Sequence, residues 1–285
     1  MLVSVLSLKG SPGVTTFAVA LAARWPGPSR ALVVEADPSG GDLALRFSLA
    51  SSPGLVSLAA AARRGGDADL AWQHTQELRG GLRVIAAPPD AEQTRAALSA
   101  LTQHPTSGLE LLRQTASQPG VVVIVDCGRV DPGSPGVPIA RSCDAMVLLS
   151  RAHADDLAHL PRRLPTVARW TSNPVFLLVG PGYSEAEVDR ELGVPPLGRV
   201  PLDPRGAAVL CGRPATRRWG PARSALGQFA QKVATELAAR QSPTAPEPPQ
   251  VHTPIPALQM VPGVPPAAVS PNGVRPAPFT GGQRP

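Results

Sequence analysis

The sequence has few lysines, few cysteines and no long apolar run. Only Lys9 and Lys232 are lysine against 25 arginines, so a lysine marks a position where arginine would be the default cation. The cysteines Cys127, Cys143 and Cys211 show no CxxC spacing, which argues against a disulfide framework or a zinc site and favours a reducing cytoplasm. No run of 18 apolar residues occurs, so the sequence predicts no membrane-spanning segment.

Composition divides the chain into two unequal parts. From Gln241 to the end there are 13 prolines in 45 residues, with no strand or helix periodicity. Such a segment cannot bury enough apolar surface to offset its ordering entropy. We therefore predict one globular domain over 1–240 and a disordered, Pro-rich tail over 241–285. The tail could dock on an aromatic groove of a partner or serve as a spacer.

Within the first 240 residues, short apolar runs alternate with segments of helical periodicity. Continuous apolar runs of this length are typical of parallel strands covered on both faces. The alternation predicts an α/β fold with a doubly wound, mostly parallel sheet flanked by helices. The expected strands are Leu2–Leu8, Ala31–Val34, Leu82–Ala86, Val121–Val125, Ala145–Leu149 and Val175–Val179. The expected helices are Thr15–Arg24, Ala91–Gln103, Gly108–Ser117, Asp155–Arg169, Ser184–Leu192 and Pro221–Arg240.

Sites in such folds lie beyond the carboxyl ends of the strands, so the junctions after the strands are informative. The first strand is followed by Lys-Gly-Ser-Pro-Gly-Val-Thr-Thr over residues 9–16, and then by a helix. A phosphate-binding loop needs glycines for close backbone approach, a helix N-terminus and a Ser/Thr hydroxyl for magnesium. Gly10, Gly13 and Thr15 supply these features. The alternative is a degenerate loop that keeps its shape and binds nothing.

Carboxylates follow two further strands. The second strand ends in Glu35-Ala36-Asp37, and the fourth ends in Asp126 before Gly128. Acids at such positions can hold hydrated magnesium or orient an attacking water. The same residues could instead serve the backbone alone, because Asp-Pro-Ser-Gly-Gly is ordinary turn chemistry and a strand-terminal Asp can cap a helix.

Taken in order, these segments resemble the ParA/MinD family of P-loop ATPases. Residues 9–16 resemble its deviant Walker A motif, KGGxGK[ST], with Lys9 on the signature lysine. The resemblance implies ATP with Mg²⁺ as cofactors and a nucleotide-bridged homodimer in which Lys9 reaches the partner subunit's phosphates. It assigns catalytic roles to Asp37 and Lys9 and metal contacts to Thr15, Asp37 and Asp126. The nucleotide contacts that it implies are Lys9, Gly10, Ser11, Gly13, Val14, Thr15 and Thr16.

Two further segments support the resemblance, which spans about residues 1–235. The phrase Gly40-Gly41-Asp42-Leu43 looks most like the CpaE branch of the family, whose members serve pilus assembly and polar localisation. Residues 192–203 look like the family's segment "lG.pvlG.iP.D". The implied function is a dimerising switch that positions a partner complex or DNA.

The departures from the family pattern concern the phosphate loop. Val14 stands where the general P-loop lysine belongs, Ser11 replaces a glycine, and Pro12 has no amide hydrogen to donate. A charge-assisted contact to phosphate contributes about 1.5–3 kcal/mol, so its loss lowers affinity by one to two orders of magnitude. At most weak ATPase activity is expected. The alternative is a pseudo-ATPase, an interaction scaffold that has lost hydrolysis.

A basic stretch near the end of the domain suggests a further partner. From Pro204 to Thr235 there is no acidic residue, and such a cluster could contact DNA phosphates without sequence preference. The alternative is an ordinary solvated face of an Arg-rich protein with net charge +6. The last helix carries an apolar stripe, which we interpret as core packing rather than as a membrane-binding face. The basic residues of the stretch are Arg205, Arg213, Arg217, Arg218, Arg223 and Lys232.

Overall fold

A computed structural model of the protein describes residues 1–103, 108–214 and 220–241. An eight-stranded sheet runs through the described part of the chain in the order β3-β4-β2-β5-β1-β6-β7-β8. All neighbouring pairs are parallel except β3 and β4, which are antiparallel. The predicted tail, apart from Gln241 at the end of the last helix, lies outside the described residues.

The strands are short and largely apolar. The central strand β1 is buried along its whole length, as expected for a parallel strand covered on both faces. The strands are β1 (Leu2–Ser7), β2 (Arg30–Glu35), β3 (Gln76–Glu77), β4 (Arg83–Ile85), β5 (Val121–Arg129), β6 (Ala145–Arg151), β7 (Asn173–Val179) and β8 (Gly198–Val200).

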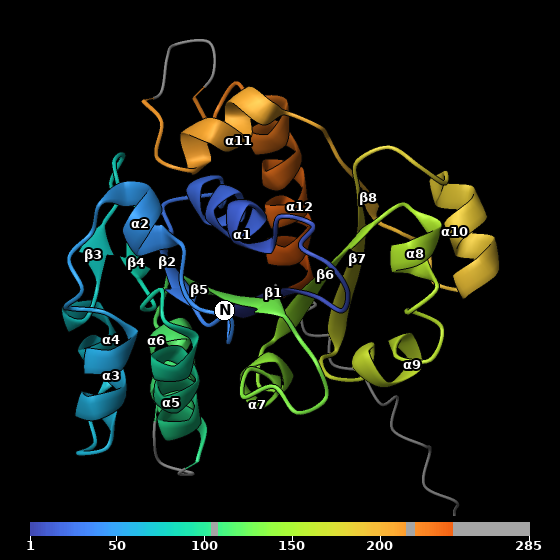
Figure 1. Cartoon of the computed structure of the whole chain (residues 1–285). Coiled ribbons are helices and arrows are strands. Elements are labelled where there is room, and N and C mark those ends of the chain that lie inside the picture. The colour runs from blue at the N-terminus through green and yellow to red at the C-terminus, as the bar shows by residue number, and fades with distance from the viewer. Residues whose placement is uncertain (104–107, 215–219, 242–285) are drawn as a thin grey trace, which may run out of the picture. The chain divides into compact units, whose positions relative to one another are not determined.

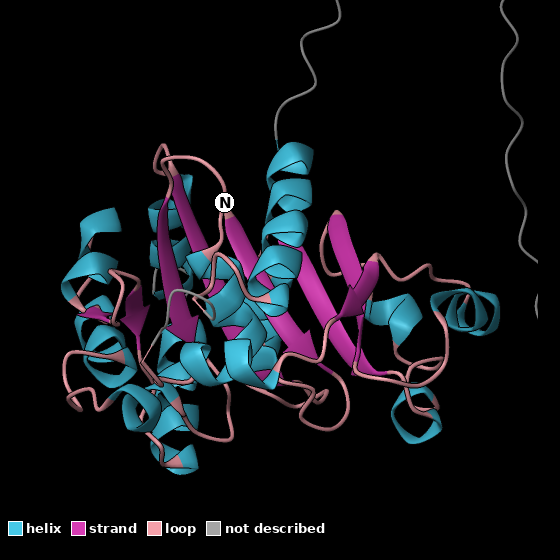
Figure 2. Cartoon of the chain, turned by 90° about the horizontal axis from the view of Figure 1, so that it is seen from above, coloured by secondary structure: helices cyan, strands magenta, loops and turns pink. Residues whose placement is uncertain are grey.

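Two helical layers cover the sheet and form two separate apolar cores (Figure 1). One layer holds α1 (Val14–Ala23), α2 (Leu43–Phe47), α11 (Pro204–Leu210) and α12 (Ala225–Gln241). Figure 2 shows α12 lying over the strands on this side. The other layer holds α3 (Leu55–Ala62), α4 (Ala68–Gln73), α5 (Ala91–Thr102), α6 (Gly108–Ser117), α7 (Val137–Arg141), α8 (Ala154–Leu157), α9 (Leu164–Val167) and α10 (Glu185–Leu192).

The structure confirms the doubly wound α/β fold and corrects one helix. The single helix predicted over Asp155–Arg169 is wrong, because the segment forms α8 and α9 with turns between them. Pro161 and Pro165 explain the break, since proline has no amide hydrogen and its ring clashes with the preceding helical turn. Several short elements were not predicted, among them α2, β3 and α11, because pieces of two to seven residues carry little periodicity.

The predicted packing of the last helix is confirmed where its side chains are described. Leu226, Val233 and Leu237 are buried in the core that α12 shares with α1, and Phe229 packs against it. The Phe229 ring lies 6.4 Å from that of Phe17, between centroids. Within the described residues, no helix has the length and apolar composition needed to cross a membrane.

We expect Phe17→Ala to lower the free energy of unfolding by about 3–5 kcal/mol, because it leaves a cavity where a fully buried ring packs between α1 and α12. Leu202→Ala is the control, since that side chain is 79% exposed and its loss should change stability by less than about 0.5 kcal/mol. Urea unfolding of the two variants checks this. Equal effects would contradict the assigned core.

Candidate functional site

The predicted site residues converge at the carboxyl ends of three neighbouring strands. In the sheet, β5 lies between β2 and β1, and Asp126 pairs with Glu35 on one side and with Val5 on the other. The loop over residues 9–13 leaves β1 at this edge and leads into α1. Asp37 follows β2 at the same edge. The topology therefore brings the loop and the acids together, as predicted from their positions after the strands.

The loop has the backbone form of an anion-binding turn. Gly10 has φ 66° and Gly13 has φ 91°, the left-handed region that glycine adopts without strain. Gly13 is the N-cap of α1, where no side chain caps the helix and no acid occupies the first turn. The amides at this helix end therefore have no side-chain partner, and the helix dipole favours an anion there.

The predicted nucleotide contacts have different surroundings in this loop. Lys9, Ser11 and Gly13 are exposed, whereas Pro12 is buried. Lys9 forms no ion pair within the described part of the chain, so its ammonium is available. The side chain of Val14 is buried in the core on the α1 side of the sheet.

The two threonines face different neighbours. The Thr15 hydroxyl lies beside Asp126 and stabilises its carboxylate. The Thr16 hydroxyl lies 3.6 Å from the Cys211 thiol at the end of α11. Thr15 is therefore the hydroxyl turned towards the acids, which fits the role that the sequence motif gave it.

Asp126 is the most perturbed acid of the site. Its side chain has no solvent exposure, and one carboxyl oxygen accepts the Gly128 amide hydrogen at 3.1 Å. The other oxygen, Oδ2, has no hydrogen-bond partner. The pKa of Asp126 is raised to about 7, first by burial and then by the charges of Glu35 and Asp37, while the Thr15 hydroxyl and the Gly128 amide oppose the rise.

Asp37 lies against the backbone of β5. Its Oδ1 accepts the Ser39 amide hydrogen at 2.8 Å. A Cβ at Gly128 would lie 2.0 Å from Asp37 Oδ2, so glycine at 128 allows the carboxylate to approach the strand. Burial raises the pKa of Asp37, and the Ser39 hydrogen bonds and Arg129 counteract this.

The Glu35 carboxylate links two segments of the backbone by accepting hydrogen bonds from both, an arrangement called the Glu35 bracket below. Its Oε1 accepts amide hydrogens from Asp42 at 2.6 Å and Leu43 at 3.0 Å, and its Oε2 accepts that of Ala87 at 2.9 Å. The side chain is only 1% exposed. Burial raises its pKa, whereas the three amides lower it. Glu35 thus joins the start of α2 to the segment after β4.

Sequence reasoning missed three residues that lie against the loop or its flanking segments from the β6 side. Arg163 donates to the Leu8 carbonyl at 3.1 Å and to the Val130 carbonyl at 2.6 Å. Arg151 donates to the Ser11 carbonyl at 3.2 Å. A Cβ at Gly10 would lie 2.8 Å from an Asp156 carboxyl oxygen. Most of these contacts join residues more than 130 positions apart, so no local sequence signal could have revealed them.

The residues at the strand ends fit a hydrated magnesium ion. An unpartnered, fully buried carboxyl oxygen beside the Thr15 hydroxyl is a pair of oxygen ligands suited to a hard cation. Within residues 1–103, 108–214 and 220–241, no group of three or more His, Cys, Asp or Glu side chains could hold a metal by itself. Magnesium does not require such a group, because it usually takes one or two carboxylates and completes its shell with water and phosphate oxygens.

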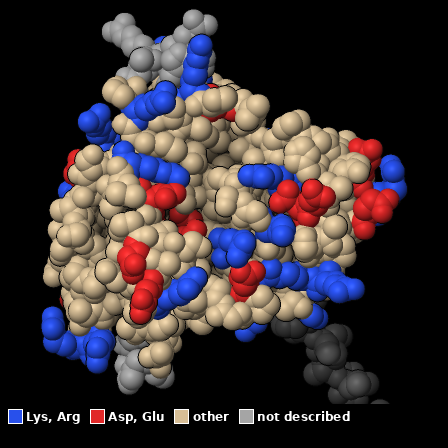
Figure 3. Space-filling view, in the orientation of Figure 1, with Lys and Arg blue, Asp and Glu red and all other residues tan. Residues whose placement is uncertain are grey.

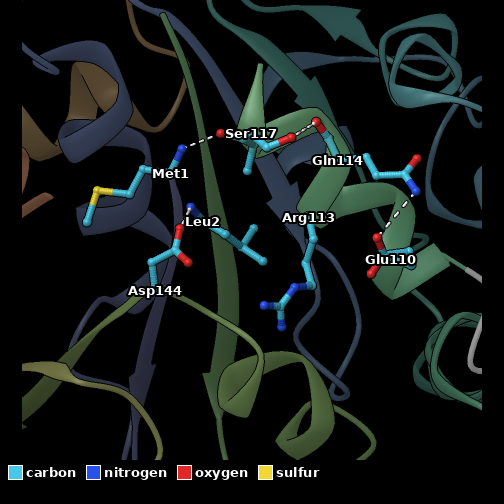
Figure 4. A pocket seen from close by; sticks show the side chains of 8 residues that line it. Met1, Leu2, Glu110, Arg113, Gln114, Ser117 and Asp144 are labelled. Carbon is cyan, nitrogen blue, oxygen red and sulfur yellow. Dashed lines mark hydrogen bonds between the residues drawn. The ribbon is translucent and has the colours of Figure 1, made fainter. Parts of the chain in front are cut away.

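A hollow of about 340 Å³ lies at the other end of the sheet and is a different feature (Figure 4). There the chain's amino group donates to the Val121 carbonyl at 3.0 Å, and Asp144 Oδ2 accepts the Leu2 amide hydrogen at 2.7 Å. Burial lowers the pKa of the amino group. These bonds fix the start of β1 at the amino edge of the sheet, opposite the candidate site.

The predicted basic stretch is only partly described. Arg217 and Arg218 lie outside the described residues. Arg205 is on α11, Arg213 follows it, and Lys232 is on α12. Figure 3 shows basic side chains gathered over α11 and the neighbouring end of the sheet, and acidic ones over α10.

Comparison with solved structures identifies the fold. A ParA-family ATPase from Chlorobium tepidum superimposes with a TM-score of 0.65 at 19% identity, over 82% of this chain and 98% of that one. The MinD protein of Pyrococcus horikoshii, solved with Mg-ADP, gives 0.61 at 20% identity over 83% and 95%. An ATP complex of McdA from Cyanothece gives 0.56 at 16% identity over 82% and 96%. No protein-family model and no curated protein matches the sequence.

The chain therefore has the fold shared by ParA-family and MinD ATPases. This confirms the fold expected from the sequence resemblance. Since these identities are 20% or lower, the likeness concerns the fold, and the roles of the residues in the candidate site rest on the geometry described above.

The raised pKa of Asp126 predicts a pH-dependent stability. Between its ordinary pKa near 3.8 and the folded value of about 7, the folded state holds a proton that the unfolded state releases, so stability falls as pH rises through this window. Asp126→Asn removes the effect. We expect the variant to be more stable than the wild type by about 1–3 kcal/mol above pH 7, and the difference to shrink towards pH 4.

Urea unfolding in EDTA across that pH range measures this difference. A stability difference independent of pH would contradict the raised pKa of the buried carboxyl group.

The three hydrogen bonds that Glu35 accepts predict that even a conservative substitution at this residue lowers the stability of the fold. Glu35→Gln turns one acceptor oxygen into a donor that faces an amide hydrogen, so we expect a loss of about 1.5–3 kcal/mol. Glu191→Gln, on the exposed end of α10, makes the same chemical change and should leave stability nearly unaltered. Thermal unfolding compares the two, and equal shifts would show that the bracket contributes nothing.

Proposed function

We propose that the protein is a nucleotide-dependent positioning switch of the ParA/MinD type that binds ATP with Mg²⁺ at the edge formed by β1, β2 and β5. The single observation that carries the proposal is the unpartnered Oδ2 of the fully buried Asp126 beside the Thr15 hydroxyl. The Mg-ADP complex of the P. horikoshii MinD and the ATP complex of McdA are relatives in fold that bind such ligands.

Each residue of the site has a role in this proposal. The amides that follow Gly13 receive phosphate oxygens at the start of α1, and Thr15 with Asp126 holds the cation. Asp37, fixed by the Ser39 amide against Gly128, is placed to orient a water molecule. Lys9 is exposed at the outer side of the loop, from where it can reach the phosphates of a second subunit. When bound, the magnesium ion would supply the positive charge that balances the buried acids.

The switch would work through dimerisation and through a partner. We propose a homodimer bridged by the nucleotide, acting in the cytoplasm, that recruits an unidentified protein component; non-specific DNA is the second candidate partner. Relatives in fold include a MinC:MinD complex from Aquifex aeolicus, with 13% identity and a TM-score of 0.56. The resemblance of residues 40–43 to the CpaE branch favours a role in pilus assembly or polar localisation.

The alternative is a pseudo-ATPase scaffold, and the loop residues favour it in one respect. Val14 supplies no cation, and its side chain is directed into the core. Pro12 supplies no amide hydrogen. Under this alternative the fold provides a rigid docking surface, and nucleotide has no influence on self-association.

Calorimetric titration with ATP and magnesium tests the proposal. We expect saturable binding by the wild type. Lys9→Ala should weaken ATP binding about tenfold. Asp126→Asn should remove the dependence of ATP binding on magnesium. Lys232→Ala is the matched control, because it removes the chain's other lysine, which is exposed on α12. No binding up to about 5 mM ATP would overturn the proposal in favour of the scaffold.

A comparison of Val14→Lys with Val14→Met distinguishes a loop that can still bind phosphate from a degenerate loop that cannot. Both side chains are longer than valine, but only lysine adds a charge at the position of the general P-loop lysine. If the cradle is intact, Val14→Lys should tighten ATP binding by about 10–100-fold, and Val14→Met should not. Equal affinities in the two variants would show that the backbone does not form the cradle.

A further inference from the structure

A large hollow lies on the far side of α1 from the phosphate loop. It has a volume of about 870 Å³ and is lined by the end of α1, the start of β2, the β3–β4 turn and the segments around α11. Because α1 begins at the loop and ends in this hollow, the helix separates the two features. Pockets of about 300–1,000 Å³ hold small-molecule ligands and cofactors, whereas a single inorganic anion needs far less space.

The hollow carries a strong excess of positive charge. Glu77 is the only acid among its lining residues in the described part of the chain, against five arginines. The arginines are Arg24, Arg30, Arg79, Arg83 and Arg213.

Two of these arginines are fixed by partners that leave their charge uncompensated. The Arg30 guanidinium lies over the Trp72 ring, 4.2 Å from its centroid, and Trp72 is itself held by a 3.2 Å hydrogen bond to Gln118. Arg24 donates to the neutral amide of Gln231 on α12, and its Nε has no hydrogen-bond partner. Only Arg83 meets an acid, at 3.0 Å from Glu77. Guanidinium groups held in place by uncharged groups are preorganised for an anion.

Arg30 also defines the shape of the ligand. One face of its guanidinium covers Trp72, and the residue is exposed and lines the hollow, so the other face is open to a ligand. A planar ring can stack on such a face, as bases do on guanidinium planes. The floor is apolar, with Leu78 and Leu210 buried and Phe47 partly buried.

We propose that this hollow, called here the arginine hollow, is a second ligand site for a small molecule that combines a flat ring with two or more phosphate groups, the nucleotide class. The ring stacks on Arg30, and the phosphates meet Arg24, Arg79 and Arg213, whose planar forks match phosphate oxygens. This site needs no magnesium, because the arginines neutralise the phosphates. Its occupation is therefore independent of the candidate site at the strand ends.

Calorimetry with ADP in EDTA tests the arginine hollow on the full chain. We expect one binding event that Lys9→Ala leaves unchanged, which separates it from binding at the phosphate loop. Arg213→Gln should weaken ADP at least tenfold. Arg162→Gln is the matched control, because it removes the same charge from an exposed residue between α8 and α9 and should have little effect.

Arg30→Lys supplies the sharper test, since it keeps the charge and loses the flat face. It should weaken ADP about tenfold and leave inorganic pyrophosphate nearly unchanged, and thermal unfolding verifies that the variant is folded. The absence of magnesium-independent ADP binding would overturn the proposal. Equal losses of affinity for ADP and for pyrophosphate in Arg30→Lys would also overturn it. The same holds if the protein binds a 20-nucleotide single strand or an acidic peptide more tightly than ADP and Arg30→Lys does not change that binding.

Discussion

The carboxyl group of Asp126 is buried at the centre of the sheet edge without a full set of partners, and the arrangement around it follows from that burial. Strand β5 places it between β1 and β2, where Glu35 and Asp37 lie close enough to raise its pKa. Each of these neighbours is fixed by backbone amides, Glu35 by three and Asp37 by that of Ser39. Asp126 receives one amide hydrogen and keeps one oxygen without a partner. A cation at this position would neutralise the charge that the fold concentrates here.

The crowding of carboxylates at this edge gives a physical reason for several residues that look unrelated in the sequence. Gly128 has φ 57° and leaves no room for a Cβ beside Asp37. Glycine at 41 is required on similar grounds, because a Cβ there would lie 2.5 Å from Glu35 Oε2 and 2.4 Å from the Ala87 carbonyl. The glycines thus set how closely the carboxylates approach the backbone, which side-chain types alone would not do.

The sequence was most informative where a feature depends on neighbouring residues. Apolar runs identified the parallel strands, and the positions of Asp37 and Asp126 after their strands predicted that they would meet. The helix over Asp155–Arg169 was mispredicted because apolar spacing suggested a continuous helix across two prolines. The bracket by Glu35 and the contacts of Arg163 and Asp156 could not be predicted, since each joins segments that only the folded sheet brings together.

The two hydrogen bonds of Arg163 also have a mechanical consequence. One guanidinium holds the carbonyl of Leu8, just before the phosphate loop, and that of Val130, just after β5. It also lies 3.8 Å from Asp131, so it is anchored on the β5 side by charge as well. The Arg163 side chain therefore joins the segments after β1 and after β5, in addition to the hydrogen bonds of the sheet. A displacement of either segment would therefore break or strain a hydrogen bond of Arg163, the residue at the start of α9.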